Sequence, residues 1–234
     1  MLYDLQSLLD ERNRTLYEGV ASQLPVVLLD SGNDLWTAHL KNGTAEIHTA
    51  DASWPGACFA HELLHISLRL RGLTCPGYVD NENIADIKEI VGWLFNILDH
   101  FKVYPEFLAL GYTGDQFLAD SDPSEVCERL DHNASELERR FIADLPIDPL
   151  ALAMPIGMLL SPPPSQRWRY ESRLKRVSPP GFFEDLEALL LEWQRSPTLN
   201  SSHTFAMFFK LCGYQRIGFS ATNTQADIVV AGNL

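Results

Sequence analysis

Short apolar runs near the N-terminus, separated by turn-forming residues, predict three β-strands. The first run ends at Ser31-Gly32-Asn33-Asp34, and Lys41-Asn42-Gly43 between the other two is typical of a hairpin turn. In the third run, Ala45 and Ile47 alternate with polar residues, which makes one face of that strand apolar. The predicted strands are residues 25–30, 35–40 and 44–49.

Apolar residues at helical spacing predict two helices directly after these strands. Trp54-Pro55-Gly56 is a plausible start for the first helix, which continues to Leu70. The chain then turns within residues 72–77, and Asn81 is a suitable N-cap for the second helix. The apolar stripe of the second helix is Ile84, Ile87, Val91, Leu94 and Leu98.

The remainder of the chain is predicted to be mainly helical, with interruptions at the proline-rich segments 161–165 and 178–181. The predicted fold class is α+β, a small antiparallel sheet packed on the first two helices with a mainly helical C-terminal part. We expect one domain over residues 1–146 and a C-terminal subdomain over 147–234. Further helices are predicted at 123–145, 166–176, 182–195 and 202–212, and a strand pair at 216–220 and 227–231.

Composition and charge narrow the class of protein. With 234 residues and 46% apolar content, the chain can bury a full core. Its net charge of −13 disfavours general nucleic-acid binding. A local basic cluster has two interpretations. It is either a binding patch for phosphate or for an acidic partner, or it is a solvated helix face paired with acidic residues. We favour the paired helix face. The basic cluster consists of Arg167, Arg169, Arg173, Lys175 and Arg176.

Cysteine usage and the apolar segments bear on the cellular compartment. The four cysteines show no C-x-x-C pair and no dense spacing, which argues against a disulfide framework or a cysteine-based zinc site. Residues 1–19 are charged and amphipathic, unlike a signal peptide. The longest apolar stretch, 147–160, is too short for a membrane span. We therefore expect a cytoplasmic protein that does not act at a membrane.

The sequence His61-Glu62-Leu63-Leu64-His65 lies within the first predicted helix and contains the candidate metal-binding and catalytic residues. Residues four apart stand on the same helix face, so both imidazoles can point at one ion with Glu62 beside them. This H-E-x-x-H arrangement is typical of zinc peptidases. The alternative is a helix with two histidines buried in the core.

A third ligand is expected because catalytic zinc usually takes three protein ligands and leaves one position open. Glu82, 17 residues after His65, could bind the metal, and Asp86 could accept the free ring N–H of a ligating histidine. These carboxylates could instead simply favour a helix N-terminus. Asp99 and His100 are the alternative third ligands. Glu82 and His100 lie about 27 Å apart along a straight helix, so both reach one zinc only if that helix breaks.

HELLH followed by Asn81-Glu82-Asn83-Ile84-Ala85-Asp86 resembles the gluzincins, zinc peptidases whose third ligand is a glutamate on a second helix. Over residues 25–100 the chain is similar to the small ImmA/IrrE-like metallopeptidases. The resemblance implies zinc ligands at His61, His65 and Glu82, a general base at Glu62 and an outer-shell partner at Asp86. The spacing of 17 residues is shorter than in many larger gluzincins.

The function expected on this basis is a soluble zinc endopeptidase that hydrolyses a peptide bond in a specific protein substrate. Zinc would activate water, and Glu62 would move its proton to the leaving amine. An exposed strand beside the zinc could bind an extended peptide, or the strands could simply cover the core. His39 and His48 are expected to be surface or structural residues. Candidate donors to the oxyanion are Tyr78, His100, Tyr104, Tyr112, His203 and Tyr214.

A second class of function is a zinc-stabilised binding or regulatory protein with a peptidase-like fold and little hydrolytic activity. Such a scaffold has no chemical need for a carboxylate between its two histidine ligands. The glutamate at position 62 therefore favours the enzyme.

Overall fold

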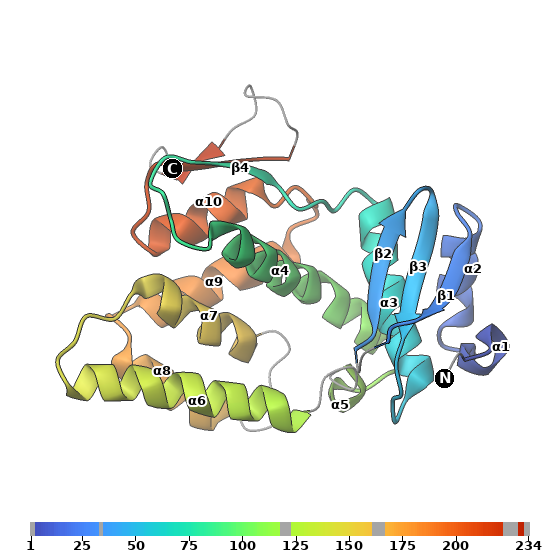
Figure 1. Ribbon diagram of the computed structural model, residues 1–234, viewed down its shortest axis with the longest axis horizontal. Coiled ribbons are helices and arrows are strands. Elements are labelled where there is room, and N and C mark those ends of the chain that lie inside the picture. Colours follow the sequence, from blue (N-terminus) through green and yellow to red (C-terminus); the bar gives the residue numbers. More distant parts are fainter. Residues whose placement is uncertain (1–2, 33–34, 118–122, 161–166, 222–228, 232–234) are drawn as a thin grey trace. The chain divides into compact units, whose positions relative to one another are not determined.

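The structure is a computed structural model that describes residues 3–32, 35–117, 123–160, 167–221 and 229–231. The chain forms two compact units (Figure 1). The first contains Met1–Gly72 and Lys102–Val126, and the second contains Leu73–Phe101 and Cys127–Leu234. Each unit is built from two separate stretches of chain. The predicted domain boundary at residue 146 stays a prediction. The predicted α+β fold class is confirmed.

The first unit contains a three-stranded sheet of β1 (Val26–Asp30), β2 (Thr37–Lys41) and β3 (Thr44–Thr49), and all three predicted strands are confirmed. The strand order is β1-β3-β2. The β2–β3 pair is antiparallel, and Asn42 and Gly43 in its turn both have positive φ, as a tight hairpin requires. The β1–β3 pair is parallel, so the sheet is mixed and not wholly antiparallel as predicted.

The apolar face of this sheet packs on α3 (Pro55–Leu70), and α3 in turn contacts α1 (Leu5–Leu8) and α2 (Arg14–Ala21). Ala45 and Ile47 are fully buried, as the alternation in β3 predicted. Pro55 occupies the first turn of α3, where its missing N–H costs no hydrogen bond. α3 runs behind β2 and β3 (Figure 1) and supplies Phe59, Leu63 and Ile66 to the same core.

The second predicted helix is α4 (Ile87–Ala109), and both of its ends differ from the prediction. Asp80 accepts hydrogen bonds from the backbone N–H groups of Glu82 and Ile84, which holds the preceding residues in a turn. Asn83 and Asp86 have positive φ, a conformation incompatible with a right-handed helix. Asn81 is therefore not a helix N-cap. At the other end α4 continues through Pro105 to Ala109, beyond Leu98, the last residue of the predicted apolar stripe.

The second unit is mainly helical, and the helices predicted near 123–145, 166–176, 182–195 and 202–212 are confirmed. A small antiparallel sheet has the order β4-β5-β6 and contains the strand predicted at 216–220. α7, β4 and the short α5 were not predicted. The bounds are β4 (Gly77–Asp80), α5 (Gly114–Phe117, first unit), α6 (Pro123–Ile142), α7 (Pro149–Leu160), α8 (Arg167–Val177), α9 (Phe182–Arg195), α10 (Ser202–Leu211), β5 (Ile217–Ser220) and β6 (Val229–Val230).

The basic cluster on α8 is paired with acidic side chains. Arg173 contacts Asp131 at 2.7 Å and Glu138 at 2.8 Å, both on α6. Lys175 contacts Glu171 at 2.9 Å and Glu184 at 3.1 Å. This agrees with our interpretation of the cluster as a paired helix face and removes the reason to treat it as a phosphate site. Within the described residues, no helix is both long and apolar enough to cross a membrane.

Candidate metal centre

Two histidine ring nitrogens converge on the buried side of α3. His61 and His65 are four residues apart on this helix, and their Nε2 atoms lie 2.8 Å from each other. The exposed fractions of the two side chains are 1% and 8%. This is a hydrogen-bonding distance, so one of the two nitrogens carries a proton until an ion displaces it. The motif thus forms the convergent pair that the sequence predicted.

His100 on α4 completes a group of three histidines whose ligand atoms all lie within 4.8 Å of one another. It is the only group of three or more histidine, cysteine, aspartate or glutamate side chains so assembled among the described residues. His100 was the alternative third ligand in the sequence analysis. Three imidazole nitrogens are a donor set that divalent transition metals accept, so the residues fit a metal ion at this place.

Phe117, at the end of α5, positions His61 in two ways. Its carbonyl oxygen lies 3.3 Å from His61 Nδ1, and its ring stacks on the imidazole at a centroid distance of 4.3 Å. A carbonyl oxygen only accepts, so Nδ1 carries the proton and Nε2 keeps its lone pair facing the other histidines. This is the tautomer that a metal ligand needs. No sequence signal identified Phe117, because a backbone carbonyl contributes the hydrogen bond.

Glu62 is held inside the protein next to the ligands. It follows His61 on α3, and only 4% of the residue is exposed. It thus lies in sequence between the two histidines whose ring nitrogens converge.

The structure does not bring Glu82 and Asp86 into the histidine group. Glu82 Oε1 accepts hydrogen bonds from the backbone N–H groups of Gln215 at 3.0 Å and Arg216 at 2.8 Å. Asp86 immediately precedes α4, and its carbonyl oxygen accepts the first hydrogen bonds of that helix. Fourteen residues separate Asp86 from His100, about 21 Å along the helix. The third residue of the histidine group is therefore one of the two alternative ligands and not a residue of the NENIAD segment.

Asp99, the other alternative third ligand, is buried on α4 but does not belong to the group of three histidines.

Of the candidate oxyanion donors, Tyr104 lies one turn after His100, and its ring meets Phe117 edge to face at 5.0 Å. Burial raises the pKa of Tyr104, with Asp115 adding to the effect. Tyr104 is thus neutral at pH 7 and available to donate a hydrogen bond.

Tyr112 has a structural role. Its hydroxyl donates to Asp10 at 3.2 Å, and burial together with Asp10 raises its pKa to about 12. Asn13 is fully buried and donates from Nδ2 to the carbonyl oxygens of Leu8 and Gly56. These contacts fasten the N-terminal segment to the start of α3.

The remaining candidate oxyanion donors belong to the second unit. They are Tyr78 on β4, His203 on α10 and Tyr214 after α10.

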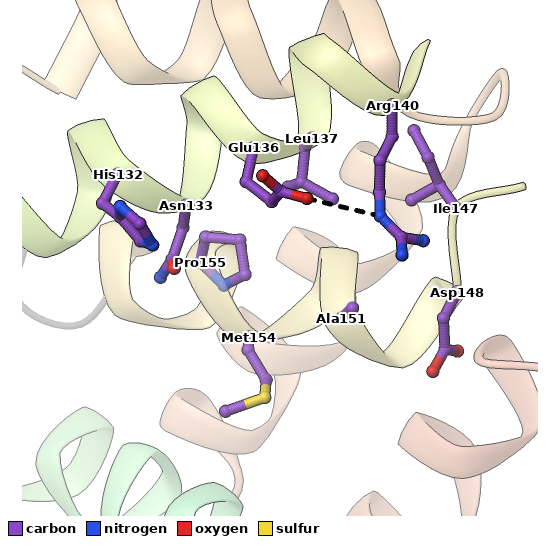
Figure 2. A pocket seen from close by; sticks show the side chains of 10 residues that line it. All are labelled: His132, Asn133, Glu136, Leu137, Arg140, Ile147, Asp148, Ala151, Met154 and Pro155. Carbon is purple, nitrogen blue, oxygen red and sulfur yellow. Dashed lines mark ion pairs between the residues drawn. The ribbon is translucent and has the colours of Figure 1, made fainter. Parts of the chain in front are cut away.

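A shallow pocket of about 250 Å³ lies between α6 and α7 in the second unit (Figure 2). His132 and Asn133 stand at one end, and Arg140 and Asp148 at the other. Glu136 pairs with Arg140 at 3.5 Å along its rim. None of the lining residues belongs to the histidine group, so this pocket adds nothing to the metal centre.

Comparisons of the chain with protein-family models, with curated proteins and with solved structures gave no match.

Proposed function

We propose that this chain is a zinc-dependent peptidase in which His61, His65 and His100 hold the metal and Glu62 is the general base. The observation that carries the proposal is the convergence of three histidine ligand atoms within 4.8 Å, two of them flanking a buried glutamate on one helix. Zinc is the metal we favour because three imidazoles with one open position are typical of its catalytic sites.

A zinc ion bound there would polarise the scissile carbonyl and lower the pKa of water at the site towards neutrality. Glu62 would accept a proton from the attacking water and deliver it to the nitrogen of the leaving amine. His61 would stay in the ligating tautomer because Nδ1–H donates to the Phe117 carbonyl. Tyr104 would donate from its hydroxyl to the oxygen that gains negative charge.

The substrate would lie along β2, an edge strand of the first sheet. β2 pairs with β3 on one side, and residues 39–41 are exposed. Such an edge can bind an extended peptide through backbone hydrogen bonds. β2 also packs on α3, the helix that bears His61 and His65, which favours a peptide as substrate.

The test compares wild-type chain with Glu62→Gln, which keeps the side-chain size and removes the base. We expect both proteins to retain about one zinc per chain after dialysis, and Glu62→Gln to lose hydrolysis by about 100-fold or more. The probe is a mixture of internally quenched fluorescent peptides with all residues represented at the central positions. Equal rates in the two proteins, or no retained zinc in the wild type, would refute the proposal.

The second candidate is a zinc-stabilised binding protein with little hydrolytic activity. It predicts zinc retention by both proteins and no cleavage by either. Cobalt substitution separates the two candidates without a substrate. In the enzyme, the visible spectrum of the cobalt-loaded chain should titrate with pH near neutrality, and Glu62→Gln should shift that transition.

A further inference from the structure

The outward face of the first sheet carries another set of metal-ligating side chains, His39, Glu46 and His48. The register places His39 on β2 directly opposite Glu46 on β3, and His48 follows Glu46 by two residues. Ala38 and Ile47, at alternate positions, are buried against the core. Since side chains alternate between the faces of a strand, the three polar side chains project together from the opposite face.

These three side chains are already neighbours. The rings of His39 and His48 meet edge to face with their centroids 5.4 Å apart. His48 Nε2 lies 4.0 Å from Glu46 Oε2, and these two side chains are only 28% and 23% exposed. Directly opposed residues have Cβ atoms about 4.5–5.5 Å apart, so modest side-chain rotations bring all three donors around one ion.

We propose that His39, Glu46 and His48 form a second, weaker binding site for a divalent transition metal such as zinc. Two imidazole nitrogens and a carboxylate oxygen are ligands that zinc accepts, with water in the remaining position. This set is less closely assembled than the three histidines of the first centre, so ordering its side chains lowers the affinity. A bound ion would fasten the edge strand β2 to β3.

The charges around this face favour binding in part. Burial, together with His48 and Arg69, lowers the pKa of His39. The carboxylate of Glu46 attracts a cation. Arg69 and Lys41 repel one, which is a further reason to expect an affinity below that of the first centre.

Zinc titration of the metal-depleted full chain by calorimetry tests the proposal. We expect a tight equivalent and a second, weaker one in the wild type. His39→Gln and His48→Gln should each weaken the second equivalent by about tenfold or more and leave the first unchanged. His203→Gln, at an exposed histidine on α10, is the matched control and should bind as the wild type does.

Two outcomes would overturn the second site. One is a wild type that binds no weaker equivalent up to millimolar zinc. The other is a His39→Gln/His48→Gln double variant with an undiminished weaker equivalent. The same titration of His61→Gln/His65→Gln, checked for folding by circular dichroism, should keep the weaker equivalent and lose the tight one. Failure of the peptidase proposal is therefore distinguishable from failure of this one.

Discussion

At the scale of single residues, the identity of the third ligand decides the charge of the centre. A glutamate at that position would cancel one charge of a divalent ion, whereas three neutral imidazoles leave its full charge to act on water. Glu82 instead accepts two backbone hydrogen bonds beside β5, which stabilise a turn of the second unit. In the proposed centre, metal affinity should therefore depend on His100 together with the two histidines of α3.

His100→Ala is expected to weaken zinc binding by about 100-fold, equivalent to about 2.7 kcal/mol, because one of three ligands is lost. Glu82→Gln should leave the zinc affinity unchanged, since its carboxylate contacts backbone N–H groups. Competition with a chromophoric chelator measures both constants. Zinc loss in Glu82→Gln with retention in His100→Ala would show that the glutamate is the ligand after all.

At the scale of elements, the sequence predicts a strand or helix that has one apolar face and misses an element that has none. Apolar and polar residues alternate in β3, and both of its ends were predicted to the residue. The HELLH motif identified α3 and two of the three converging histidines. α7 is apolar on nearly every side, with Leu152, Ala153 and Ile156 all fully buried, so no helical periodicity marked it. Glu82 was preferred to the third histidine because residues 81–86 resemble the gluzincin motif. The positive φ of Asn83 and Asp86, which keeps both residues out of α4, does not show in a hydrophobic pattern.

The packing of α7 on α4 is close enough to be tested with one methyl group. A Cβ on Gly157 would lie 2.9 Å from Trp93 Cη2, closer than packed atoms tolerate. Gly157→Ala is therefore expected to lower the free energy of unfolding by about 1–3 kcal/mol. Gly92→Ala, on α4 with nothing within 4 Å of the added Cβ, should be neutral or stabilising by up to about 1 kcal/mol. Urea denaturation measures both, and equal stabilities would mean that Trp93 moves freely.

At the scale of the whole molecule, an excess of negative charge is combined with local ion pairing. The net charge is −13, yet ion pairs join α8 to α6: Arg173 and Arg176 on α8 both pair with Glu138 on α6. The hydrogen bond from Arg173 holds the pKa of Glu138 below its ordinary value, in spite of partial burial. A carboxyl whose pKa is lower in the folded state stabilises the fold when it is ionised.

The pH dependence of stability follows from the lowered pKa of Glu138 in the folded state. The contribution of Glu138 should be fully present above about pH 5 and be lost as the pH falls through its folded-state pKa. Glu138→Gln should cost about 1–2 kcal/mol at pH 7 and reduce the loss of stability between pH 5 and 3. Glu128→Gln, at an exposed site on the same helix, is the control. Thermal unfolding across this range would contradict the assignment if the two variants behaved alike.

The discontinuous first unit sets an order of events during synthesis of the chain. Residues Met1–Gly72 leave the ribosome well before Lys102–Val126, although both belong to that unit. The chain grows at about 5–20 residues per second, so a few seconds separate the emergence of α3 from that of the second half of α4. His100, the third histidine of the proposed metal centre, lies on α4 and emerges after His61 and His65. In that proposal, loading of the ion becomes a late step of maturation, reached only when α4 has emerged and folded.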